Sequence, residues 1–170
     1  MDIAIVVRLK ATDPAAVTAL STLQRLKPDI WPVELHRFDH WLFREPEAGR
    51  DTVEEIVSHF HDIVNPNKQT WHFTDDPELL ETSGSGTACR DVLVTDRVDS
   101  ISENWSSIMR RRGFHVAGVV YSVLWRFVYG PEVTFEEAGL SAMTLTRSSR
   151  RDSGLLANPV SQEIRLLDRT

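Results

Sequence analysis

The sequence lacks several features that would point directly to an activity or a compartment. Cys89 is the single cysteine among 170 residues, so no internal disulfide can form and a reducing compartment is expected. The net charge of −6 argues against a general binder of nucleic acid or anionic membranes, because both require a basic surface. No apolar run approaches the roughly 18 residues of a membrane span, and no positively charged leader precedes the first predicted strand. We therefore expect a cytoplasmic protein.

The chain also lacks a recognisable catalytic constellation. The segment from Thr82 to Thr87 is rich in Gly and Ser, but it precedes a strand instead of opening a helix, so a linker is favoured over a phosphate-binding loop. His36 and His40 lie four apart on a predicted strand, a spacing that does not suit metal chelation. Cys89 has no base supplied by a nearby motif. We predict no catalytic residue, no metal and no cofactor.

One five-residue pattern occurs twice, 93 residues apart. Each copy reads Asn-Pro-x-x-Gln, follows a predicted helix and leads into a strand-like run. Asn tolerates turn geometry, and Pro ends a helix and fixes the exit into the next strand. The turn residues are Asn65, Pro66 and Gln69 in the first copy and Asn158, Pro159 and Gln162 in the second.

The order of predicted elements repeats around the two turns, which indicates one small unit written twice. Residues 1–74 form the first predicted repeat, 75–90 a linker and 91–170 the second repeat. Strands are predicted at 3–9, 33–43 and 69–73, then at 92–95 and 116–129, with a bulge or bend between His36 and His40.

Helix starts are indicated by capping residues. Asp13 precedes a proline at the first helical position, and Ser/Thr-x-x-Glu boxes begin at Thr52, Ser100 and Thr134. The strand at 116–129 is apolar on both faces, and helices can cover only one of them. We therefore expect an α+β fold of two α/β sandwiches packed sheet to sheet.

Two short stretches resemble a known family. Val7-Arg8-Leu9-Lys10 followed by Asp13-Pro14, and Leu155-Leu156-Ala157-Asn158-Pro159-Val160 before a closing strand, are similar to the opening and closing signatures of the PurS-type small subunit of phosphoribosylformylglycinamidine synthase. The large single-chain form of that enzyme has a tandem PurS-like pair as its N-terminal domain. The resemblance implies two ferredoxin-like repeats that form a pseudo-dimer.

The function implied by this resemblance is structural. PurS-like units hold the glutaminase part against the ATP-dependent synthetase part of this purine-biosynthesis amidotransferase, so that ammonia from glutamine reaches the substrate. The second opening strand lacks the Leu-Lys ending, and residues 131–153 are longer and more polar than a compact unit needs. Because of these departures, the resemblance does not imply that the second half keeps a binding surface of the family.

Other interpretations stay open beside this one. A tandem α/β sandwich is also suited to a regulatory domain that binds a small metabolite between its halves, and a stand-alone enzyme is the weakest alternative. Arg147, Arg150 and Arg151, with interspersed serines, are candidate anion-binding residues, although a solvated loop is the favoured explanation. We expect no membrane partner and no nucleic-acid partner.

Overall fold

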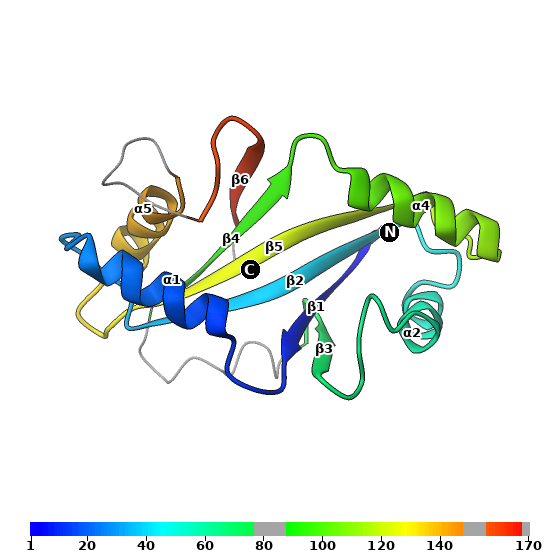
Figure 1. Ribbon diagram of the computed structural model, residues 1–170, viewed down its shortest axis with the longest axis horizontal. Helices are drawn as coiled ribbons and strands as arrows, with labels where there is room; N and C mark the ends of the chain where they lie inside the picture. Colours follow the sequence, from blue (N-terminus) through cyan, green and yellow to red (C-terminus); the bar gives the residue numbers. More distant parts are fainter. Residues whose placement is uncertain (77–87, 148–155, 168–170) are drawn as a thin grey trace. The chain divides into compact units, whose positions relative to one another are not determined.

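The computed structural model describes residues 1–76, 88–147 and 156–167. The elements of these residues are β1 (Ile3–Leu9), α1 (Pro14–Arg25), β2 (Glu34–Arg44), α2 (Arg50–His59), β3 (Gln69–Phe73), β4 (Cys89–Asp96), α4 (Ser100–Arg112), β5 (Gly118–Val128), α5 (Phe135–Thr146) and β6 (Gln162–Leu167). Figure 1 shows them coloured along the chain. The α+β class expected from the sequence is confirmed.

The strand order is β3-β1-β2-β5-β4-β6, and every pairing with a known register is antiparallel. The sequence predicted a separate sheet for each repeat, whereas hydrogen bonding joins the six strands in one order. The reason lies in β2 and β5, which are 11 residues long, about twice the usual strand length, and are neighbours in that order. The pairing of β2 with β1 runs without interruption from Asp39 to Phe43, and the bulge or bend expected between His36 and His40 stays a prediction.

The chain divides into two compact units, and each is described by itself. Unit 1 contains Met1–Ala11, Phe38–Leu79 and Val98–Ser122. Unit 2 contains Thr12–Arg37, Leu80–Arg97 and Val123–Thr170. Each of the long strands β2 and β5 therefore contributes one part to each unit.

The core of unit 1 lies between its strands and the helices α2 and α4. Side chains of one face of β1 and β2 pack there against Ile56 of α2 and Met109 of α4, both fully buried. The buried members are Ile3, Ile5, Val7, Trp41, Phe43, Val53, Ile56, Val57, Ile63, Val64, Phe73, Met109 and Val119. Burial of apolar side chains in this cluster stabilises the unit by about 25 cal/mol per Å² of apolar surface removed from water.

The core of unit 2 lies between its strands and the helices α1 and α5, which are neighbours in Figure 1. Leu23 of α1 and Ala142 of α5 are fully buried there. The buried members are Ala16, Leu23, Leu35, Val92, Val94, Trp125, Phe127, Tyr129, Ala138, Ala142, Leu145 and Ala157.

The first helix of each repeat packs in the unit built mainly on the strands of the other repeat. Helix α1 follows β1 in the chain, yet Ala16 and Leu23 pack with Val92 and Val94 of β4. Helix α4 follows β4, yet Met109 packs with Ile5 of β1. Each unit therefore contains segments of both sequence repeats. The division of the sequence into repeats at 1–74 and 91–170 stays a prediction.

Two of the predicted capping boxes are wrong, and one is confirmed. Helix α2 begins after Gly49, and the Thr52 hydroxyl accepts a hydrogen bond from the Ala48 backbone N–H at 3.1 Å instead of capping the helix. Helix α4 is capped by Asp99, one residue before Ser100, because the carboxylate accepts the N–H of Ser102. Thr134 and its partner three residues later form the predicted reciprocal box.

Candidate functional site

The two Asn-Pro turns have the same hydrogen-bond geometry. In the first, the Asn65 backbone N–H donates to Oε1 of Gln69 at 2.7 Å, and the Gln69 N–H donates to the Asn65 carbonyl at 2.8 Å. The Asn65 side chain accepts the N–H of Asn67 at 3.0 Å. The Asn side chain thus closes the turn and the Gln side chain reaches back across it, which explains why both residue types recur.

The second turn repeats these bonds one for one. The Asn158 N–H donates to Oε1 of Gln162 at 2.9 Å, and the Gln162 N–H donates to the Asn158 carbonyl at 2.8 Å. The Asn158 side chain accepts the N–H of Val160 at 3.0 Å. The six turn residues predicted from the sequence therefore form two equivalent structures, one in each unit.

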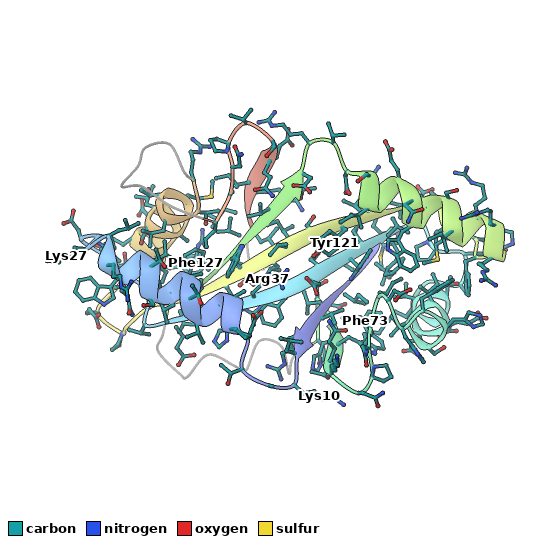
Figure 2. All side chains as sticks on the ribbon, in the orientation of Figure 1. Lys10, Lys27, Arg37, Phe73, Tyr121 and Phe127 are labelled. Atoms are coloured by element: carbon teal, nitrogen blue, oxygen red, sulfur yellow. The ribbon has the colours of Figure 1, made fainter. Side chains whose placement is uncertain are left out.

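The residue after the first strand of each repeat contacts the turn of the same repeat. The Lys10 N–H donates to the Lys68 carbonyl at 2.9 Å, and the Arg97 N–H donates to the Ser161 carbonyl at 2.9 Å. Lys10 and Arg97 are thus equivalent positions. Figure 2 labels Lys10 at the end of β1, close to β3.

A hollow lies beside each turn. The first hollow, in unit 1, has a volume of about 460 Å³. Its lining residues are Lys10, Glu54, Val57, Ser58, His61, Val64, Pro66, Gln69, Thr70 and Trp71. The Lys10 ammonium donates to the Pro66 carbonyl at 2.7 Å, so its charge is held at the edge of the turn.

The second hollow, in unit 2, has a volume of about 430 Å³. Its lining residues are Arg97, Arg147, Ala157, Pro159, Gln162, Glu163 and Ile164. Arg97 and Glu163 form an ion pair at 3.4 Å, with 51% and 69% of their side chains exposed. The Gln162 amide N–H donates to Asp96 at 2.8 Å, which fixes the amide that closes the turn.

Of the three candidate anion-binding arginines, Arg147 lies within the described residues. Arg147 lies at the end of α5, and its backbone pairs with Ala157 next to the second turn. Its side chain lines the second hollow. Arg150 and Arg151 lie outside the described residues.

A buried ion pair in unit 2 was missed by sequence reasoning. Nε of Arg126 donates to Oδ1 of Asp91 at 2.9 Å, and Nη2 donates to Oδ2 at 3.0 Å. Arg126 is 2% exposed and Asp91 is 5% exposed. Part of the signal was present in the sequence, because each charged residue lies inside an apolar strand. Only the structure shows that the two are Cα partners in the sheet.

Two further polar groups have shifted pKa values. Burial raises the pKa of Tyr129 above its ordinary value, although its hydroxyl donates to Ser141, which itself donates to the Ile30 carbonyl. Hydrogen bonds from the Thr134 side chain and backbone lower the pKa of the exposed Glu137 carboxyl. Both groups stabilise unit 2 around α5, and neither is among the described residues that line the two hollows beside the turns.

The described residues offer no metal site. In residues 1–76, 88–147 and 156–167, no group of three or more His, Cys, Asp or Glu side chains is close enough to hold a metal ion. Within the same ranges, no helix has the length and apolar character needed to cross a bilayer. Cys89 is buried.

Comparison with known proteins adds no relative, since no protein-family model, no curated protein and no solved structure matches the chain. The class defined by fold and site is an α+β protein with a duplicated strand-helix-strand-helix-strand order and a matching turn and hollow in each unit.

Proposed function

We propose that this chain is a non-catalytic assembly domain of a phosphoribosylformylglycinamidine synthase in purine biosynthesis. In this proposal, it links the glutaminase part of the amidotransferase to its ATP-dependent synthetase part. Its two repeats would be ferredoxin-like units related as a pseudo-dimer. The chain would contribute to the ligase reaction by positioning the two catalytic parts, with no turnover of its own.

The observation that carries the proposal is the meeting of an opening strand and a closing turn in each unit. The two stretches that resemble the PurS family lie in different halves of the sequence. Each of them borders one of the two equivalent turns: Lys10, which ends the opening stretch, binds the first turn, and Asn158 of the closing stretch forms the second. Both halves thus carry the same combination of elements, as a tandem PurS-like pair would.

Partner contact is proposed at the turns and the terminal strands. Strands β3 and β6 stand at the two ends of the strand order, and an end strand presents backbone groups to a partner. Val160 at the tip of the second turn is 84% exposed, so its side chain is accessible to a partner. A partner that covers Val160 would gain from burying it.

The direct test is association with the two catalytic parts. The purified chain is immobilised and mixed with the glutaminase and synthetase parts, with and without glutamine and nucleotide. In a reconstituted reaction, the chain should raise the glutamine-dependent rate and leave the rate with ammonium chloride unchanged, because only the first requires transfer between parts. Absence of both association and rate effect contradicts the proposal.

A matched pair of variants localises the contact. Val160→Lys should weaken association by about tenfold, because an exposed apolar contact of about 1.4 kcal/mol is lost. Val17→Lys is the control, since Val17 is 54% exposed and lies on helix α1, none of whose residues lines either hollow beside a turn. Equal loss in both variants would assign the effect to charge and not to the turn.

The alternative proposal is a regulatory domain that binds a small metabolite. It is favoured by the presence of a hollow beside the turn in each unit, both with volumes in the range of small-molecule sites. A thermal-shift screen tests it, because a ligand that binds the native state raises the unfolding temperature. Tight metabolite binding without partner association would replace the assembly proposal.

A further inference from the structure

The two hollows have different charge although their turns are equivalent. The first is lined by one cation and one anion, Lys10 and Glu54, besides His61. The second is lined by two cations, Arg97 and Arg147, and one anion, Glu163. Among the described lining residues, with histidine neutral, the formal balance is zero in the first hollow and +1 in the second. The first hollow forms beside an equivalent turn without an arginine among its described lining residues, so the turn itself does not require Arg147.

The cations also differ in how strongly they are engaged. The Lys10 ammonium donates to the Pro66 carbonyl at 2.7 Å. Arg97 pairs with Glu163 at 3.4 Å while both side chains are more than half exposed, and exposed pairs of this kind contribute little. Replacing this partner with a stronger anion therefore costs little.

Arg147 is held in place by its backbone, and its charge is uncompensated within the described part of the chain. Its N–H donates to the Met143 carbonyl at 3.1 Å, and the adjoining Thr146 carbonyl accepts the N–H of Ala157 at 3.0 Å. In residues 1–76, 88–147 and 156–167, no carboxylate forms an ion pair with Arg147. The guanidinium lines the hollow, and no carboxylate of the described residues neutralises it.

The other wall of the second hollow is apolar. Ala157, Pro159 and Ile164 contribute to it. The Gln162 amide is held in the turn, because its NH2 group donates to Asp96 and its carbonyl accepts the Asn158 N–H. The hollow therefore combines two arginines with an apolar surface, in a volume of about 430 Å³ that suits a small organic molecule.

We propose that the second hollow binds a small phosphomonoester. Its phosphate would lie between Arg97 and Arg147, in place of the Glu163 carboxylate, and its organic group would lie against Pro159 and Ile164. Arginine suits this role because its planar fork matches phosphate oxygens in a bidentate manner. The site does not depend on the assembly function, so either can fail without the other.

The test is a titration of the whole chain with inorganic phosphate and with phenyl phosphate at constant ionic strength. Binding is measured by calorimetry and by NMR of the arginine side chains. Phenyl phosphate should bind more tightly than inorganic phosphate, because its ring contacts the apolar wall. Arg97→Gln and Arg147→Gln should each weaken binding by about tenfold, the loss of one charge-assisted contact. Lys10→Gln at the equivalent position of the first hollow is the matched control and should leave binding unchanged.

A variant that binds phosphate more tightly than the parent cannot owe this change to a folding defect. Glu163→Gln removes the competing carboxylate and should tighten phosphate binding by about threefold, which corresponds to a weak exposed pair. The proposal is overturned if the two Arg variants bind as the parent does, if Lys10→Gln loses as much as they do, or if Glu163→Gln weakens binding. It is also overturned if the parent chain shows no binding at about 50 mM phosphate.

Discussion

The first and second repeats differ most at one pair of neighbouring strand positions. Counting six residues back from Lys10 and Arg97 places Ala4 in register with Asp91, and their Cα partners are Leu42 and Arg126. One repeat thus has an apolar pair where the other has a buried ion pair. The comparison teaches that the strand pairing does not require the two charges. Burying them carries a high desolvation cost, so the ion pair is not explained by the pairing alone.

The same register shows what the repeats share. Trp41 and Trp125 become equivalent, as do Phe43 and Phe127, and all four are buried in the core of their own unit. A repeated Trp-x-Phe on the helix-covered face is a second signature of the duplication, beside the Asn-Pro turns. The shared residues lie on the covered face, and the differing residues lie on the opposite face.

The largest expected effect tests the shared part. Trp125→Ala and Trp41→Ala should each lower the free energy of unfolding by about 3 to 5 kcal/mol, because each truncates a large core side chain. Urea unfolding of both variants measures the loss. A loss near zero for Trp125 would contradict its burial, and a large difference between the two would weaken the equivalence of the repeats.

The next effect tests the differing part. Arg126→Leu should cost about 3 kcal/mol, because it leaves the Asp91 carboxylate buried without the arginine. The double variant Asp91→Ala with Arg126→Leu copies the first repeat and should recover most of this loss. Recovery in urea unfolding would indicate that the ion pair is dispensable for the fold, and a double variant as unstable as the single one would contradict the comparison.

Much of the fold could be predicted from local patterns. The apolar run of β1, the proline at the start of α1 and the Thr134 box were all read correctly, because each depends on residues that are close in sequence. The exchange of α1 and α4 was not predicted. An apolar helix stripe shows that a face is buried, but it does not show which strands bury it.

The candidate site was predictable to the same extent. The turn residues were found because Asn, Pro and Gln act within five positions of one another. The hollows were not found, because each also needs a residue from the end of a distant strand, such as Arg97 beside Glu163. The Asp91 and Arg126 pair required the register between β4 and β5, which composition cannot supply.

A smaller effect tests the turns. Asn65→Ala and Asn158→Ala should each cost about 1 to 2 kcal/mol, because each removes the side chain that accepts a backbone N–H within the turn, as in the loss of a helix cap. The two losses should be similar, as the geometries are. Lys68→Ala, at an exposed position of the first turn, is the control and should change stability little.

The smallest effect concerns Tyr129, whose equivalent in the first repeat is Glu45, so the repeats differ at this position. Burial raises the pKa of Tyr129 above its ordinary value of 10.0, so the folded state holds the phenol proton more tightly than the unfolded state does. The resulting stability is fully present below pH 10 and is lost as the pH rises above it, because only the unfolded state ionises there. Tyr129→Phe cannot ionise, and at pH 7 it should be less stable than the parent by about 1 kcal/mol, the value of its hydrogen bond to Ser141. Denaturant unfolding of both proteins between pH 7 and pH 11 should therefore show the difference between them shrinking above pH 10, and a difference that stays constant would contradict the burial of a neutral phenol in unit 2.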